Sequence, residues 1–138
     1  MAEDSRNSGV EERTLQSFAA ANRNDWDVVM GFFASDAVWE VPEFRVFEGR
    51  DAIRGFLEDW VGAYRDADIQ VETLLDLGRG VVFLTATLNG RLAGSTAHLR
   101  VRFGASYRWV DDLIVYIASY SNVAEARAAA VGVAATGG

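Results

Sequence analysis

Few side chains in this sequence are suited to acid–base or metal chemistry. There is one histidine, His98, and no cysteine, so a zinc site built from imidazole and thiolate ligands is not expected. The chain also lacks a phosphate-binding loop, a dinucleotide fingerprint and a Gly-x-Ser-x-Gly nucleophile elbow. We therefore expect no cofactor and no metal, and the candidates for chemistry are carboxylates and tyrosines.

Two of these residues are candidate catalytic groups. Tyr107 lies in an alternating apolar run, and its hydroxyl could donate a hydrogen bond to a carbonyl or enol oxygen. Glu40 could act as a base, because an apolar pocket raises the pKa of a carboxylate toward neutrality. Strict alternation directs Glu40 outward, so this role requires a twist or bulge at Pro42. Asp59 and Glu72 are expected to be solvated, and His98, which alternates with arginines, is expected at an interface.

Helical and strand spacing predict the elements that must position these groups. Two helices are expected from Val10, Thr14, Phe18 and Asn22 and from Trp26, Val29, Met30 and Phe33, and a third, capped by Asp51, from Ile53, Phe56, Leu57, Trp60, Val61 and Tyr64. A short strand at 37–42 precedes the third helix. Four longer strands are expected at 69–77, 81–92, 96–109 and 113–120. This order predicts an α+β fold, with a flexible tail at 1–9, one domain at 10–131 and a second flexible tail at 132–138.

Apolar residues occur on both sides of the predicted sheet. Leu99, Val101, Phe103, Ala105, Tyr107 and Trp109 alternate with His98, Arg100, Arg102, Gly104, Ser106 and Arg108. In the neighbouring strands, Val82, Leu84, Ala86, Leu88, Ile114, Tyr116, Ala118 and Tyr120 are expected to face away from the helices. Such a face needs a cover, so we predict a homodimer packed sheet to sheet, with the arginines at its margin. The alternative is an apolar run that tolerates exposure.

The segment from Phe32 to Ala52 carries a family resemblance. It reads Phe-Phe-Ala-Ser-Asp, then Ala-Val-Trp-Glu-Val-Pro, and later Glu-Gly-Arg-Asp-Ala. This series resembles the signature of the nuclear transport factor 2-like superfamily, which includes ketosteroid isomerase, limonene epoxide hydrolase and the SnoaL-like polyketide cyclases. The resemblance implies a cone-shaped α+β barrel, in which a curved antiparallel sheet wraps around the three helices of the N-terminal half and encloses a pocket.

The predicted pocket is apolar and aromatic. Its expected ligand-binding residues are Trp39, Val41, Phe56, Trp60, Tyr64, Thr87, Asn89, Phe103, Ala105, Ile117 and Ser119. Thr85 joins Thr87 and Asn89 if strand 81–92 has the assumed register, whereas a slip by one residue would replace them with Ala86 and Leu88. Taken singly, the aromatic residues are also explained as ordinary core.

The catalytic residues of the related enzymes are not found at the matching positions. Val41, Ser17 and Ala105 stand where ketosteroid isomerases are expected to carry their base, their oxyanion tyrosine and their protonated aspartate. The tyrosine, asparagine and Arg-x-Asp pattern of limonene epoxide hydrolase is absent as well. Two functions therefore stay open: a SnoaL-like enzyme that isomerises, cyclises or hydrates a small polyketide- or terpenoid-like molecule, and a non-catalytic small-ligand binder or dimerisation module.

Charge and composition exclude other partners. The chain of 138 residues has 13 basic and 20 acidic residues, a net charge of −7. This acidic balance is unsuited to nucleic acid. The sequence has no apolar signal core and no run long enough to span a membrane, so we expect a cytoplasmic protein that contacts no membrane.

Overall fold

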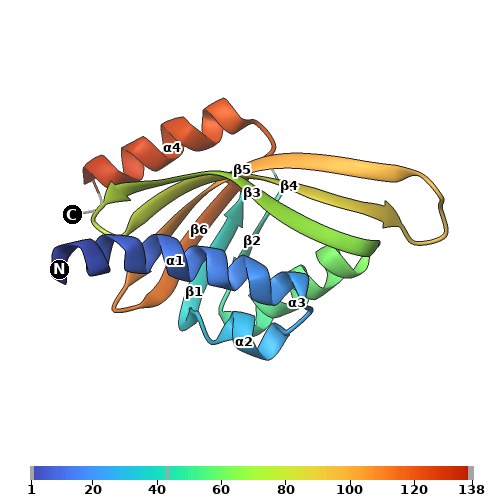
Figure 1. Cartoon of the computed structure of the whole chain (residues 1–138), viewed down its shortest axis with the longest axis horizontal. Helices are drawn as coiled ribbons and strands as arrows, with labels where there is room; N and C mark the ends of the chain where they lie inside the picture. The colour runs from blue at the N-terminus through green and yellow to red at the C-terminus, as the bar shows by residue number, and fades with distance from the viewer. Residues whose placement is uncertain (1, 43, 137–138) are drawn as a thin grey trace.

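Six strands form one curved sheet, with helices on both of its sides, in the part of the chain that the computed structural model describes (Figure 1). The description covers residues 2–42 and 44–136, and the side chains of 9–42 and 44–132. Helices α1 (Ala2–Asn22), α2 (Trp26–Met30) and α3 (Arg50–Gly62) lie on one side of the sheet, and α4 (Val123–Thr136) lies on the other. The predicted α+β class is confirmed, and the sheet stays open at its edges rather than closing into a barrel.

The helices differ from the predicted ones at their ends. Helix α1 begins inside the segment predicted as an N-terminal tail, and α4 begins within the predicted domain, where no helix was expected. Helix α2 ends at Met30, and Phe33 already belongs to the first strand. The cap of α3 is Gly49, so the prediction of Asp51 as the cap is wrong. Asp51 instead lies in the first turn, where its carboxylate faces the positive end of the helix dipole.

The strands follow the order β2-β1-β6-β5-β4-β3. Their bounds are β1 Phe33–Val41, β2 Arg45–Glu48, β3 Tyr64–Gly78, β4 Val81–Leu92, β5 His98–Val110 and β6 Leu113–Tyr120. Neighbouring strands are antiparallel except β1 and β6, which run parallel. The expected purely antiparallel sheet is therefore corrected to a mixed one, because the first strand inserts beside the last.

The main core lies between the sheet and α1 to α3. Ile53, Leu57 and Val61 of α3 are buried against it. Asn22 ties the end of α1 to β3, because its amide donates to the Ile69 carbonyl at 2.9 Å and accepts from the Ile69 N–H at 2.8 Å. The side-chain amide thus imitates a neighbouring strand and satisfies both backbone groups of Ile69. These two hydrogen bonds hold the end of α1 against the sheet.

Helix α4 covers the outer face of β4 and β5. Its Ala126 and Ala130 pack with Phe83 in a second, smaller core. The contact is close, since a Cβ atom at Gly104 would lie 2.7 Å from the Ala126 Cβ. Part of the face that the sequence assigned to a second copy of the chain is thus covered by the chain's own C-terminal helix.

This cover explains the wrong prediction of the face of β4. Residues 81–88 are all buried, because helices lie on both sides of the strand. Val82, Leu84, Ala86 and Leu88 pack in the main core, so the expected outward placement of these four is wrong. Ile114 is also in the main core, because a register shift between Arg108 and Trp109 places it opposite Trp109. None of the described helices is both long and apolar enough to cross a bilayer.

Candidate functional site

A cleft of about 210 Å³ opens at the end of β6 and is the candidate site. Strand β6 pairs with β5 only as far as Tyr120, opposite Gly104, whereas β5 continues back to His98. The space beside this unpaired stretch of β5 is closed by β1 and α3. Its lining comprises Trp39, Val41, Phe56, Trp60, Val101, Arg102, Phe103, Ser119, Tyr120 and Ser121. We call this space the outer cleft.

Aromatic rings in mutual contact form the walls of the outer cleft. On α3, Phe56 and Trp60 stand one turn apart and stack with ring centroids 6.2 Å apart. Phe56 meets the edge of Trp39 on β1 at 5.4 Å, and Trp60 meets Phe103 on β5 at 5.6 Å. Such offset and edge contacts are favourable for aromatic pairs. The helix therefore links two distant strands through a row of rings that presents an apolar surface to a ligand.

Hydroxyl groups supply the polar part of the lining. Trp39 Nε1 donates to Ser119 Oγ at 2.9 Å, which occupies one acceptor site and leaves the serine proton free to donate. The guanidinium of Arg102 is directed elsewhere, because its Nε donates to Glu72 on β3 at 3.2 Å, across strand β4. The outer cleft can therefore hold an apolar body and offer hydrogen bonds to an oxygen of the ligand.

A second, smaller space lies deeper between the sheet and the helices. This inner cavity measures about 30 Å³, and its lining includes Tyr107, Ser17 and Phe18. Tyr107 is 5% exposed and lines this cavity, whereas the fully buried side-chain oxygens without a hydrogen-bond partner among the described residues are those of Thr85 and Ser106. Burial raises the pKa of Tyr107 above the ordinary tyrosine value, so the hydroxyl keeps its proton and serves as a donor.

The structure brings together six of the residues predicted to bind a ligand. Trp39, Val41, Phe56, Trp60, Phe103 and Ser119 line the outer cleft. Ala105 and Ile117 are buried core, and Tyr64 packs at the core's edge, so these three line neither space. The placement of Thr87 and Asn89 in the pocket is wrong, because they pair with Arg102 and Arg100, whose side of the sheet faces away from helices α1 to α3. Sequence reasoning missed Arg102, Tyr120 and Ser121, although the end of a predicted strand at 120 marks the last two as residues at an opening.

Glu40 lies on the outer face of the sheet, as strict alternation predicts, so the hypothesis that a bulge at Pro42 turns it into the pocket is wrong. Strand β1 keeps strict alternation there, with Trp39 opposite Ile117 and Glu40 opposite Ala118. The Tyr116 hydroxyl donates to Glu40 Oε1 at 2.5 Å. Burial, and next the hydrogen bond to Glu40, raise the pKa of Tyr116.

Replacing Glu40 by glutamine should lower the pKa of Tyr116, because it removes the negative charge that opposes formation of the tyrosinate. Ultraviolet absorbance titration measures this change, and Tyr116→Phe identifies the transition that belongs to Tyr116. The affinity of the outer cleft for a ligand should stay the same, since Glu40 faces the other side of the sheet. An unchanged tyrosine titration would show that the pair does not form in solution.

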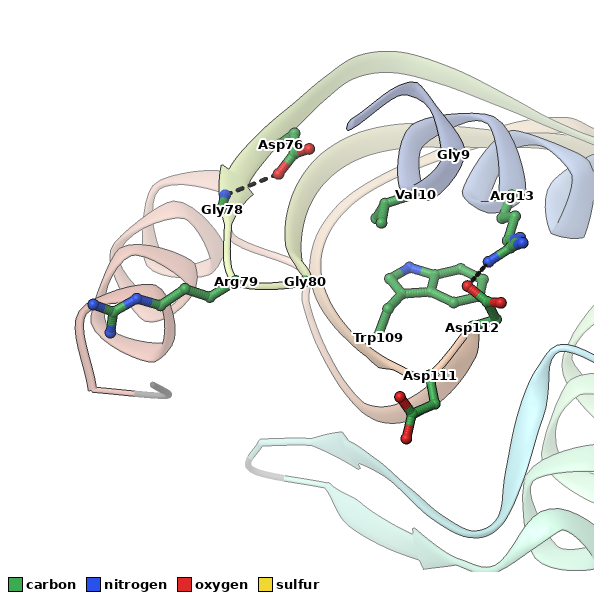
Figure 2. Close-up of a pocket in the computed structure, with 10 residues that line it drawn as sticks. All are labelled: Gly9, Val10, Arg13, Asp76, Gly78, Arg79, Gly80, Trp109, Asp111 and Asp112. Carbon is green, nitrogen blue, oxygen red and sulfur yellow. Dashed lines mark hydrogen bonds and ion pairs between the residues drawn. The ribbon is translucent and has the colours of Figure 1, made fainter. Parts of the chain in front are cut away.

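A wider polar hollow of about 540 Å³ lies at the other end of the sheet, between α1 and the turns after β3 and β5 (Figure 2). The charged side chains that line this hollow either bond to a neighbouring group or point away from the hollow. Arg13 forms an ion pair with Asp112, Asp76 accepts from the Gly78 N–H, and Figure 2 shows Arg79 extending away from Trp109. The groups do not converge on one point, so the outer cleft is the better candidate despite its smaller volume.

Comparison with known proteins supports the fold. The model of a family described as "SnoaL-like domain" matches residues 15–117. No curated protein matches the sequence. A solved structure from Jannaschia sp. CCS1, described as a SnoaL-like polyketide cyclase, is 14% identical with a TM-score of 0.75, covering 91% of this chain and 93% of that one.

Two further solved structures share the architecture. One from Xanthomonas campestris pv. campestris, described as a polyketide cyclase, is 21% identical with a TM-score of 0.69, covering 86% of this chain and 94% of that one. The other is SalBIII, an epoxide hydrolase/cyclase-like enzyme in pyran ring formation in the polyether salinomycin. It is 17% identical with a TM-score of 0.72, covering 87% of this chain and 93% of that one. At these identities the likeness concerns the fold.

Proposed function

Because the chain belongs to the SnoaL-like domain family, we propose that its outer cleft binds a small, largely apolar molecule of polyketide or terpenoid type. The observation that carries this proposal is the aromatic lining by Trp39, Phe56, Trp60 and Phe103, with the Ser119 hydroxyl beside it. Binding sites for small molecules combine an apolar wall with a few placed polar groups in this way. The volume of about 210 Å³ is below the roughly 300–1,000 Å³ of most ligand pockets, so a small ligand is expected.

The similar structures suggest the chemistry of the ligand. Two of them are described as polyketide cyclases, and SalBIII acts in the formation of a pyran ring. Polyketides and pyran rings are carbon skeletons that carry oxygen, a chemistry that suits aromatic walls and a hydroxyl donor. The same class of ligand is therefore proposed for the present chain.

A second candidate function is isomerisation, cyclisation or hydration of the bound molecule. Tyr107 favours it, since a hydroxyl that keeps its proton and belongs to a residue lining the inner cavity can stabilise a developing oxyanion. Among the described residues, no Asp or Glu lines either space, and Glu40 lies on the other face of the sheet. Orientation of the substrate would then contribute more than proton transfer to the rate.

Replacing Phe56 by alanine tests the binding proposal. The variant should bind naphthalene about tenfold more weakly than the native chain, because an aromatic wall is lost. Quenching of naphthalene fluorescence measures the affinity. Leu15→Ala is the matched control, since Leu15 is 46% exposed on α1 and lines neither space. Equal affinity in the native chain and Phe56→Ala, or an equal loss in Leu15→Ala, would contradict the assignment of the cleft.

The homodimer and the cytoplasmic location stay predictions. The sheet face that a second copy would need is narrower than expected, because α4 covers the outer side of β4 and β5. The uncovered part includes Tyr116 and Glu40, whose polar groups bond to each other. A dimer through this part would pack over β6, β1 and β2.

A further inference from the structure

We propose that Trp60 controls how deeply a ligand enters, and that its indole moves aside so that a carbonyl oxygen of the ligand reaches the Tyr107 hydroxyl. This inference rests on the proposed function, since it concerns the same ligand. The expected ligand is an apolar molecule that is longer than the outer cleft and carries a ketone oxygen at the end that enters first.

The first observation is that three residues separate the two spaces. Trp39, Trp60 and Phe103 line both the outer cleft and the inner cavity. They therefore form a partition, with about 210 Å³ on one side and about 30 Å³ on the other. A ligand held in the outer cleft touches these three rings but does not reach Tyr107 unless one of them moves.

The second observation identifies the ring that can move. Trp39 is held by its hydrogen bond to Ser119, by stacking on Phe33 at 6.3 Å and by burial to 6% exposure. Phe103 lies within β5, paired with Ala86 of β4. Trp60 stands in the last turn of α3, only partly buried, and among the described residues no hydrogen bond holds its indole. Its ring contacts with Phe56 and Phe103 can be exchanged for contacts with a ligand.

The third observation explains why the inner cavity favours an oxygen atom. Tyr107 lines this cavity, and its hydroxyl keeps its proton, so it can donate a hydrogen bond to an acceptor atom that enters the cavity. The cavity of about 30 Å³ has room for about one water molecule. A carbonyl oxygen of the ligand fits in the same space and would accept a hydrogen bond from the Tyr107 hydroxyl, while the apolar remainder of the ligand replaces the displaced indole.

The experiment compares two probes of the same shape. Acetylnaphthalene carries the carbonyl oxygen, and isopropenylnaphthalene has a methylene group in its place. The native chain should bind the ketone about fivefold more tightly than its isostere, and Tyr107→Phe should abolish this preference. In Trp60→Ala the preference should persist and the affinity for the ketone should rise about threefold or more, because the indole no longer has to be displaced. Trp60→Phe, which keeps an aromatic ring, should change the affinity in the same direction by less.

The outcomes separate the inference from the proposed function. If neither probe binds the native chain or a Trp60 variant, the proposed function fails and the inference fails with it. If both probes bind equally and Tyr107→Phe changes nothing, the cleft binds apolar molecules but the inference is overturned. A ketone preference that survives Tyr107→Phe, or a loss of ketone affinity in both Trp60 variants, also overturns it.

Discussion

Replacing Gly80 by alanine should lower the free energy of unfolding by about 3 kcal/mol. Gly80 has a φ of +78° in the turn between β3 and β4, a conformation that strains any residue with a Cβ atom. A Cβ atom there would lie 2.3 Å from the Trp109 carbonyl oxygen. The turn cannot shift freely, because the Trp109 N–H donates to the Gly80 carbonyl at 2.8 Å.

Gly94→Ala is the matched control for this substitution. Gly94 has a φ of +83°, but a Cβ atom there meets nothing within 4 Å. The free energy of unfolding of this variant should therefore fall by only about 1 kcal/mol, which is the cost of a left-handed backbone for a residue with a Cβ atom. Chemical denaturation of both variants measures the difference. Equal losses at the two positions would show that the turn at Gly80 relaxes and that its contact with Trp109 does not constrain β4 and β5.

The sequence predicted the ends of strands 81–92 and 113–120 correctly. It also predicted the faces of β5, the strand in which polar and apolar residues alternate. In β5, Phe103, Ala105 and Tyr107 face the helices as expected, because arginines, Gly104 and Ser106 alternate with them. From this parity the aromatic part of the cleft followed, since α3 places Phe56 and Trp60 on the same side.

The errors on the faces of β4 have one physical cause, the unpredicted helix α4. Its segment is rich in alanine and carries no strong apolar stripe, so periodicity gives no signal. Alanine nevertheless packs closely, as Ala126 does on Gly104. Because α4 buries the outer face of β4, that strand is apolar on both sides and its register cannot be read from alternation. The misplacement of Thr87 and Asn89 follows from this, and so does part of the argument for a dimer.

The catalytic hypothesis for Glu40 failed for a different reason. Alternation predicted an outward side chain, and the catalytic hypothesis required a bulge at Pro42 that would reverse it. The structure keeps the alternation and gives the carboxylate a partner, Tyr116, from the neighbouring strand β6. Pairing between strands so distant in the chain depends on topology, which one sequence does not encode in any local pattern.

The largest effect on the site itself is expected from Trp39→Ala. Trp39 is 6% exposed, stacks on Phe33 and lines both spaces. Its removal should lower the free energy of unfolding by about 3–5 kcal/mol, since the loss of a large buried ring leaves a cavity. It should also merge the outer cleft with the inner cavity. Trp39→Phe should lose less stability, because it keeps a ring against Phe33, although it removes part of the volume of the indole and the N–H that bonds to Ser119.

Naphthalene should restore part of the stability lost in Trp39→Ala. A ligand that binds only the folded chain stabilises it by about 2.7 kcal/mol at a hundredfold excess over its Kd, and thermal unfolding with and without naphthalene measures this gain. The control is Ile114→Ala, because Ile114 is 1% exposed but lines neither space, so the void it leaves should be too small for the probe. Rescue confined to Trp39→Ala would mean that the merged space admits a ring where the indole stood. If naphthalene stabilised both variants equally, the probe would bind elsewhere on the fold, and this result would contradict the assignment of the cleft as the ligand site.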